Sequence, residues 1–377
     1  MNLTKLMVVA ILSGSAVTQT FPVYGQCGGD GFTSAGSCAS GSYCQSENAF
    51  YYQCVPGTAT GSTSAATQPA STSAKTTTTP ATTTHTSSSS TSSKVTTAIS
   101  TATAASSTST RYLFVFGDSY STTEFYIQGG YPSASDPIGL PTLPGDTTSG
   151  GLNWVGLVTS QLNTSLVLTY DWAYYGADTS NAIIATGVTT DFIAQVGEFE
   201  EYLVPAPSEA PWTASNSQVA VWMGINDVGE CFWESEVYAT CPIDEVMETY
   251  FGLLEDLYND GVRDFLLLMV PPFYKAPIFA DYTTAELQSL IDDIQSYNEA
   301  LETNLATFKS SYSGVTGSVF NTSASFWTVI DNPTAYGATD ATCQNTDGTT
   351  CVWYDDYHPG QAIQKLVAEA LANGYVI

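Results

Sequence analysis

The stretch Tyr112-Leu113-Phe114-Val115-Phe116, followed at once by Gly117-Asp118-Ser119, decides how the larger part of this chain folds. Five apolar residues in a row, ended by a turn signal, are typical of a strand that is buried on both faces. Further strands are predicted downstream, and amphipathic helices alternate with them. This alternation predicts a mostly parallel sheet that is covered by helices on both sides.

The predicted elements can be given as residue ranges. The strands are 112–116, 166–172, 218–223 and 264–270, with a weaker one at 318–321, and the helices are 152–162, 191–203, 243–259, 284–310 and 359–372. In the last helix, Pro359 suits the first turn and Asn373-Gly374 marks the end. Sites in such folds lie at the carboxyl ends of the strands, and Gly117-Asp118-Ser119 stands at one of these ends.

The charge of the chain excludes some partners. From residue 111 onward there are 34 acidic and 5 basic residues, a difference of −29. Such a surface repels phosphate backbones and anionic lipids, so we expect neither nucleic acid nor a membrane as a partner. We expect a monomer that needs no cofactor.

Two segments are predicted to lie outside any folded domain. Residues 1–20 begin with Lys5 and continue with the apolar run 6–12, which predicts a secretory signal peptide cleaved between Ala16 and Phe21. Residues 56–110 are almost entirely Ser, Thr, Ala and Pro, a composition that cannot bury enough apolar surface to fold. We interpret them as an O-glycosylated linker in a secreted, extracellular protein. The folded units are then residues 21–55 and residues 111–377.

The eight cysteines fall into two quartets, one in each predicted unit. The first is Cys27, Cys38, Cys44 and Cys54, and the second is Cys231, Cys241, Cys343 and Cys351. An even number of cysteines in an exported chain favours disulfides over metal binding, so we expect no metal. The second quartet allows three pairings, of which we favour Cys231–Cys241 and Cys343–Cys351 because these close the shorter loops.

The first unit resembles a family that is known from fungal enzymes. From Tyr24-Gly25-Gln26-Cys27 to Tyr51-Tyr52-Gln53-Cys54, the cysteine spacing and the flanking residues are similar to those of a family 1 carbohydrate-binding module. The resemblance implies a small β module with the bridges Cys27–Cys44 and Cys38–Cys54. It also implies a flat cellulose-binding face made of Tyr24, Phe50 and Tyr51, with Asn48 and Gln53 assisting. Planar aromatic rings can stack on glucose units without any charge, so cellulose is the expected partner.

Three short motifs carry the chemistry of the second unit. They are Gly117-Asp118-Ser119, Gly224-Ile225-Asn226-Asp227 and Asp355-Asp356-Tyr357-His358. His358 is the only histidine outside the linker. The first two motifs are each typical of a plain turn, but the three together offer a hydroxyl, an amide and a carboxylate–imidazole pair. These are the parts that acyl transfer needs.

Other reaction schemes fit the sequence less well. A zinc-dependent deacetylase needs clustered histidines, and the chain lacks the Gly-x-Ser-x-Gly elbow of α/β-hydrolases. A glycosidase needs only two carboxylates, so the 34 acidic residues leave that scheme open. Five aromatic residues could form the floor of a sugar-binding site: Trp172, Tyr174, Tyr175, Trp222 and Trp233. At least half of them are expected in the core.

In this order the three motifs resemble the GDSL/SGNH hydrolase superfamily over essentially all of residues 111–377. Within it, residues 117–123 look most like fungal acetylesterases of carbohydrate esterase family 16, although Tyr120 stands where leucine is commoner. The resemblance implies a three-layer α/β/α, flavodoxin-like domain with a mostly parallel five-stranded sheet. It also implies Ser119 as nucleophile, His358 as base and Asp355 as the group that orients the imidazole, with Asp356 as a rival.

The same resemblance implies an oxyanion hole made of the Ser119 and Gly176 N–H groups and the Asn226 amide. Gly176 comes from the block 171–177, where Tyr175 replaces a frequent small residue. The expected function is that of a serine carbohydrate esterase tethered to cellulose, which removes O-acetyl groups from hemicellulose or its oligosaccharides, acetylated xylan above all. Two alternatives stay open: an esterase acting on pectic acetyl groups or lipid esters, and a non-catalytic cellulose-binding wall protein.

Overall fold

The computed structural model describes residues 19–21, 26–28, 36–46, 52–56 and 110–376. They belong to two units, Met1–Ala105 and Ser106–Ile377. Nearly all of the predicted signal peptide and linker lies outside the described residues. So do four members of the predicted cellulose-binding face: Tyr24, Asn48, Phe50 and Tyr51.

The N-terminal unit consists of short strands, as predicted for a small β module. Strands β2 (Gln26–Gly28), β4 (Ser42–Ser46) and β5 (Tyr52–Pro56) form an antiparallel sheet in the order β2-β5-β4, and β1 (Gln19–Phe21) pairs with β3 (Gly36–Cys38). Gln53 lies within β5. Cys38 and Cys44 are both disulfide-bonded. The pairings Cys27–Cys44 and Cys38–Cys54 stay predictions.

The C-terminal unit is built on a five-stranded sheet in which every neighbouring pair is parallel. Its strands are β6 (Arg111–Gly117), β7 (Val167–Asp171), β8 (Ser217–Trp222), β9 (Asp264–Leu268) and β10 (Thr316–Phe320), in the order β10-β9-β8-β6-β7. All five lie within two residues of their predicted ends. This is the flavodoxin-like order, whose switch point falls between β6 and β8.

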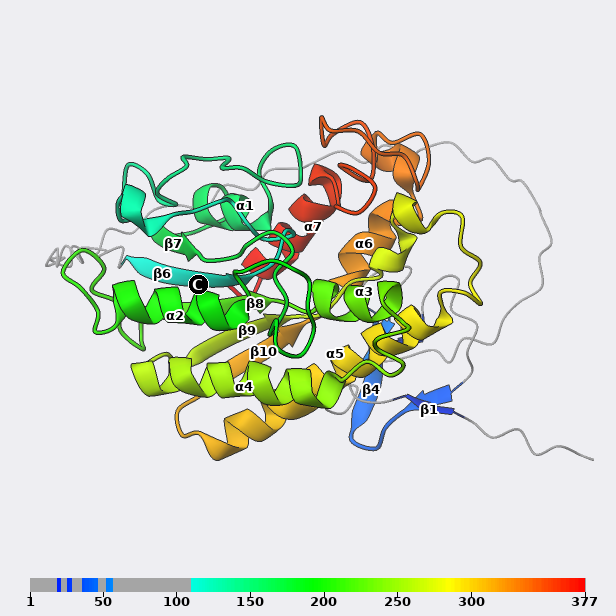
Figure 1. Ribbon diagram of the computed structural model, residues 1–377, viewed down its shortest axis with the longest axis horizontal. Helices are drawn as coiled ribbons and strands as arrows, with labels where there is room; N and C mark the ends of the chain where they lie inside the picture. Colours follow the sequence, from blue (N-terminus) through cyan, green and yellow to red (C-terminus); the bar gives the residue numbers. More distant parts are fainter. Residues whose placement is uncertain (1–18, 22–25, 29–35, 47–51, 57–109, 377) are drawn as a thin grey trace, which may run out of the picture. The chain divides into compact units, whose positions relative to one another are not determined.

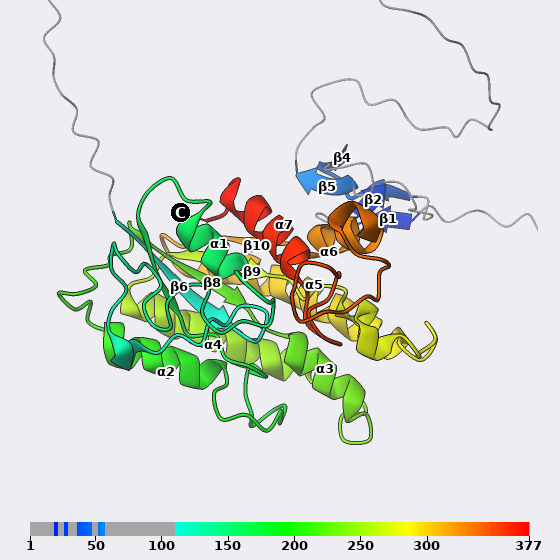
Figure 2. The same ribbon diagram turned by 90° about the horizontal axis from the view of Figure 1, so that it is seen from above.

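Helices cover both faces of the sheet, which confirms the three-layer prediction (Figure 1). On one face lie α2 (Phe192–Leu203), α4 (Ile243–Asp260) and α5 (Gln288–Ser311), and on the other lie α1 (Trp154–Ser160), α6 (Ser323–Ile330) and α7 (Gln361–Ala372). Figure 2 shows the same two groups of helices from above. Both layers exclude water from the central strands, so every residue of β8 is buried.

Two helices were not foreseen from the sequence, and several predicted helix boundaries are wrong. The helix α5 begins at Gln288 rather than at residue 284, and α1 spans Trp154–Ser160 rather than 152–162. Residues 224–227 do not form a plain turn, because α3 (Ile225–Trp233) begins there and places Asn226 in its first turn. Gly224 has φ +123°, and a Cβ at this position would lie 2.4 Å from the Tyr297 ring, so the sharp strand-to-helix turn needs glycine. The helix α6 was also missed. Pro359 precedes α7 rather than lying in its first turn, because Gly360 is the N-cap.

Four short 3₁₀ helices complete the described secondary structure of the C-terminal unit: η1 (Ile127–Gly129), η2 (Phe273–Lys275), η3 (Pro277–Phe279) and η4 (Pro333–Tyr336). The disulfides Cys231–Cys241 and Cys343–Cys351 are both formed, which confirms the pairing favoured from loop length. Within the part of the chain that the structure describes, no helix is both long enough and apolar enough to span a bilayer.

Candidate active site

Ser119 lies two residues beyond the end of β6, in a turn that is held from several sides. A Cβ on Gly117 would lie 2.6 Å from the Trp222 carbonyl oxygen on β8, so glycine is needed for the chain to leave the sheet here. Gln195 of α2 donates to the Gly117 carbonyl (2.8 Å) and accepts from its N–H (3.0 Å). The Thr148 hydroxyl donates to the Ser119 carbonyl at 2.6 Å. The backbone on both sides of the serine is therefore fixed.

His358 joins Ser119 to Asp355 in one chain of hydrogen bonds. The Nε2 atom of His358 lies 2.8 Å from Ser119 Oγ, and Nδ1 lies 2.9 and 2.8 Å from the two oxygens of Asp355. Oδ1 of Asp355 also accepts from the backbone N–H groups of Tyr357 (2.8 Å) and His358 (2.7 Å). The neighbouring Asp356 is exposed, and it is its backbone carbonyl that is hydrogen-bonded, by the Ile278 N–H at 2.9 Å. The carboxylate beside the imidazole is thus that of Asp355.

The electrostatics of this arrangement favour an ionised Asp355. Burial opposes ionisation of the carboxyl group, but the hydrogen bond and the charge of His358, together with the two backbone N–H donors, outweigh it. The pKa of Asp355 therefore lies below its ordinary value. A carboxylate so held accepts a hydrogen bond from the Nδ1–H group of His358, which leaves Nε2 unprotonated and free to accept a proton from the Ser119 hydroxyl.

Gly176 and Asn226 come together beside the serine turn. The Asn226 side chain donates from Nδ2 to the Ala177 carbonyl at 2.8 Å, and the Tyr174 N–H donates to the Gly117 carbonyl at 3.1 Å. Gly176 has φ +70°, a conformation that favours glycine. Among the described residues, no acceptor is found for the backbone N–H of Ser119 or of Gly176. These N–H groups are free to bind an added acceptor.

Tyr120 links the serine segment to the histidine segment, a role that the sequence did not reveal. Its ring is fully buried and packs edge-on against the His358 ring at 5.6 Å. Its hydroxyl donates to the Tyr357 carbonyl at 2.6 Å. Tyr120, which follows Ser119, thus holds Tyr357, which precedes His358. The only signal in the sequence was that Tyr120 departs from the commoner leucine, whereas Thr148 and Gln195 gave no signal at all.

Three buried carboxyl groups lie directly behind the site. They are Asp118, Asp178 and Asp227, all of them fully or almost fully buried. Burial, and then repulsion by Asp227, raises the pKa of Asp118 to about 8. Burial, and then repulsion by Asp178, raises the pKa of Asp227 to about 7, although the Thr179 N–H donates to both of its oxygens. At neutral pH the group therefore retains protons.

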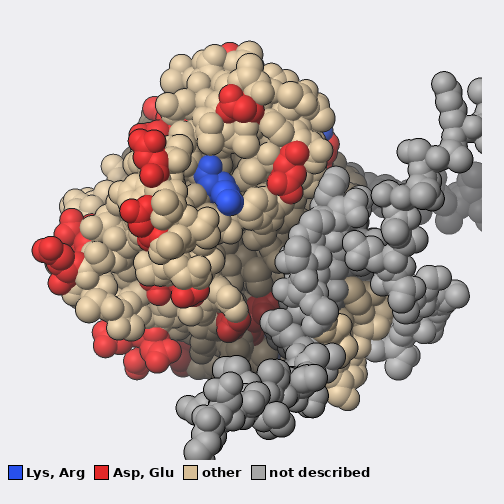
Figure 3. Space-filling model, turned by 90° about the vertical axis from the view of Figure 1, so that its right-hand side faces the viewer, with Lys and Arg blue, Asp and Glu red and all other residues tan. Residues whose placement is uncertain are grey.

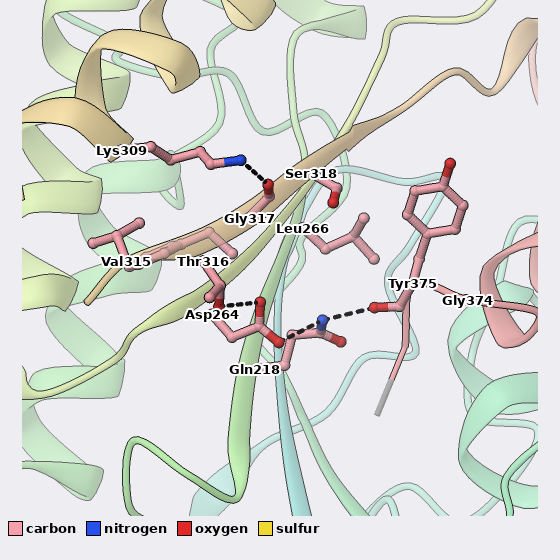
Figure 4. A pocket seen from close by; sticks show the side chains of 11 residues that line it. Gln218, Asp264, Leu266, Lys309, Val315, Thr316, Gly317, Ser318, Gly374 and Tyr375 are labelled. Atoms are coloured by element: carbon pink, nitrogen blue, oxygen red, sulfur yellow. Dashed lines mark hydrogen bonds between the residues drawn. The ribbon is translucent and has the colours of Figure 1, made fainter. Parts of the chain in front are cut away.

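A pocket of about 370 Å³ lies at the opposite edge of the sheet, at the amino ends of β8, β9 and β10 (Figure 4). Its polar groups bond to one another: Gln218 donates to Asp264 (3.1 Å) and to the Tyr375 carbonyl (2.7 Å). Lys309 donates to the Gly317 carbonyl at 2.7 Å. None of the residues of the candidate site lines this pocket, so it is not the place of the reaction.

The surface of the molecule is acidic, and some of its aromatic residues are exposed. Figure 3 shows acidic side chains scattered over one face, with few basic atoms among them. Of the aromatic residues expected to floor a sugar site, Trp172 and Trp222 belong to the core, whereas Tyr174 and Trp233 are exposed. Tyr175 is half-buried, so two of the five residues lie in the core, and the expectation that at least half of them do is wrong.

Two parts of the chain match known protein families. Residues 113–371 match the family described as GDSL-like lipase/acylhydrolase. The chain belongs to this family. Residues 23–51 of this GDSL-family protein match the fungal cellulose binding domain. Both resemblances noted in the sequence are thereby confirmed, and so is the prediction of an ester hydrolase.

Individual relatives of this GDSL-family protein differ in how much of the chain they match. An acetylesterase from Thermothelomyces thermophilus is 46% identical over 270 residues, which are 71% of this chain and 89% of that protein. A probable mannan endo-1,4-beta-mannosidase F from Emericella nidulans is 53% identical over 51 residues, which are 14% of this chain and 12% of that protein. Among solved structures, Axe2, an acetylxylan esterase from Geobacillus stearothermophilus, has a TM-score of 0.41 and 16% identity, covering 71% of this chain and 95% of that one.

Proposed function

We propose that this protein is a secreted serine carbohydrate esterase that removes O-acetyl groups from hemicellulose or its oligosaccharides while its N-terminal module binds cellulose. The observation that carries the proposal is the chain of hydrogen bonds from Asp355 through His358 to Ser119. The similarity to an acetylesterase along 89% of that relative supports an acetyl ester as the group removed. The match to a fungal cellulose binding domain supports docking on the plant cell wall.

In the first half of the reaction, Ser119 Oγ attacks the carbonyl carbon of the acetyl ester while His358 Nε2 accepts its proton. The tetrahedral intermediate collapses when His358 returns the proton to the leaving oxygen of the sugar, and the acetyl group stays on Ser119. In the second half, His358 takes a proton from a water molecule that attacks the acetyl-serine. It then returns this proton to Ser119 Oγ as the bond between Oγ and the acetyl carbon breaks and acetate leaves. Asp355 keeps the proton of the neutral imidazole on Nδ1 and stabilises the imidazolium.

The negative charge that develops on the acetyl oxygen needs donors that are already in place. We assign this role to the backbone N–H groups of Ser119 and Gly176 and to the Asn226 amide. Asn226 has a second N–H besides the one given to the Ala177 carbonyl, so it can hold its position and still donate. Removing one such donor typically costs about 2.7–4 kcal/mol of transition-state stabilisation.

The test is release of acetate from acetylated xylan, acetylated mannan and short acetylated xylo-oligosaccharides, measured beside 4-nitrophenyl esters of increasing acyl length. We expect acetate from the glycans and a fall in rate beyond the acetyl ester. A preference for long acyl chains would instead favour a lipid-ester hydrolase. Ser119 should be labelled by a serine-directed phosphonate, with Ser119→Ala as the unlabelled control. No labelling together with no turnover would leave a non-catalytic wall protein.

A further inference from the structure

An aromatic platform stands at the surface on the β8 and β9 side of Ser119. Two of its rings are exposed, Trp233 at the end of α3 (38%) and Tyr282 beyond η3 (41%). The buried Phe279 stacks under Trp233, with ring centroids 5.0 Å apart and planes 12° from parallel. Phe232 packs edge-on against the rings of all three. The plane of Trp233 is therefore set by the rings around it rather than free to rotate.

The platform is joined to both halves of the candidate site. Asn226 lies in the first turn and Trp233 at the end of the same helix, roughly 10 Å apart along its axis. The Cys231–Cys241 disulfide holds the end of that helix. On the other side, Phe279 contacts the ring of Tyr357 at 6.3 Å, one residue before His358. Any ligand on Trp233 is thus held in a fixed relation to Ser119.

The charges along α3 disfavour an anionic ligand on the platform. Residues 225–242 contain no lysine or arginine, whereas Glu230 and Glu234 lie in the last turn and at the C-cap of α3. Negative charges at a helix C-terminus oppose the helix dipole, so these two glutamates do not serve the stability of α3. Carboxylates accept hydrogen bonds from hydroxyl groups and repel phosphates and uronates. Exposed flat rings next to carboxylates that accept hydrogen bonds from hydroxyl groups are suited to binding a neutral sugar.

We propose that Trp233, backed by Phe279, and Tyr282 form a subsite that stacks against neutral pyranose rings of the glycan whose acetyl group lies at Ser119. This subsite rests on the proposed function and adds to it a preference for oligosaccharides over single sugars. Trp233 lies roughly 10 Å along the axis of α3 from Asn226, whose amide is assigned to the acetyl oxygen. The ring bound at Trp233 is therefore a further residue along the glycan and not the acetylated one.

The experiment compares kcat/KM for a series of acetylated xylo-oligosaccharides of increasing length with kcat/KM for 4-nitrophenyl acetate, which has no sugar. We expect Trp233→Ala to lower the ratio of the two by about 3- to 10-fold for the longer oligosaccharides, the range expected for one aromatic stacking contact. Trp233→Phe retains a flat ring and should recover much of the ratio. Tyr126→Ala is the matched control, since it removes another exposed ring (49%) whose segment contacts α2 rather than α3.

The outcomes distinguish failure of the subsite alone from failure of the proposed function. If the parent protein releases acetate from oligosaccharides and Trp233→Ala keeps the parental ratio at every length, the subsite is refuted and the proposed function stands. If Trp233→Ala and Tyr126→Ala lower the ratio equally, the subsite is refuted as well. If the parent protein hydrolyses 4-nitrophenyl acetate but no acetylated glycan, the proposed function fails and the subsite with it. Should Trp233→Ala fail to fold, Tyr282→Ala removes the other exposed ring and is compared with Tyr126→Ala in the same way.

Discussion

Replacing Asp355 by asparagine should reverse the hydrogen bonding of His358 without moving it. Oδ1 of Asp355 accepts two backbone N–H groups at 2.8 and 2.7 Å, so the carbonyl oxygen of the new amide must take that position. Its NH₂ group then occupies the position of Oδ2, 2.8 Å from Nδ1. Because NH₂ donates, Nδ1 must accept, and the imidazole proton moves to Nε2. A protonated Nε2 cannot take the proton of Ser119.

The loss expected from a wrong tautomer is about 10⁴-fold in kcat, the size seen for this change in another serine hydrolase. That factor equals roughly 5 kcal/mol of activation free energy. The assay is kcat on 4-nitrophenyl acetate for the parent and for Asp355→Asn. Asp356→Asn is the matched control, because it removes an adjacent exposed charge and should leave kcat within about twofold. An Asp355→Asn variant within tenfold of the parent would refute the tautomer argument.

Three further predictions concern the surroundings of the triad. Asn226→Ala should keep the fold and lower kcat by roughly 10²–10³-fold, and a near-parental kcat would remove Asn226 from the mechanism. Tyr120→Phe loses the hydrogen bond to the Tyr357 carbonyl. We therefore expect the free energy of unfolding to fall by about 1 kcal/mol, with a lower Tm, and kcat to fall several-fold. An unchanged kcat would show that this hydrogen bond does not position His358. The pKa of Asp118 is raised to about 8 and that of Asp227 to about 7. Between about pH 4 and pH 8 the folded state therefore binds more protons than the unfolded state, so Tm should fall as the pH rises over this range. Asp118→Asn should flatten this fall, and a parental Tm that is level or rises over that range would contradict the assignment.

The sheet was predictable because its strands are buried along their length. Runs such as Leu113-Phe114-Val115-Phe116 need no tertiary information to be identified as strands. The helix α3 was missed for the opposite reason. Its N-cap is Gly224, and an aspartate and a further glycine lie among its first five residues, all of which are turn signals. Its stability comes from packing against α5 and from the Cys231–Cys241 bridge.

The residues that meet at Ser119 could be named from the sequence because the chemistry of acyl transfer calls for few side-chain types, and His358 has no rival outside the linker. Their supports could not be named. Tyr120 and Thr148 act by donating to backbone carbonyls, and any residue presents such a carbonyl, so no pairwise pattern marks the partner.

Residue types and local periodicity thus predicted the strands and named the candidate side chains that lie together at Ser119, because burial and chemistry leave their marks on short stretches of chain. Only the tertiary structure determined which carboxylate faces the imidazole, which aromatic rings stay exposed and which acidic side chains are buried away from water. These outcomes depend on contacts between segments more than a hundred residues apart, such as Ser119 and His358, and on the low dielectric that only complete packing creates.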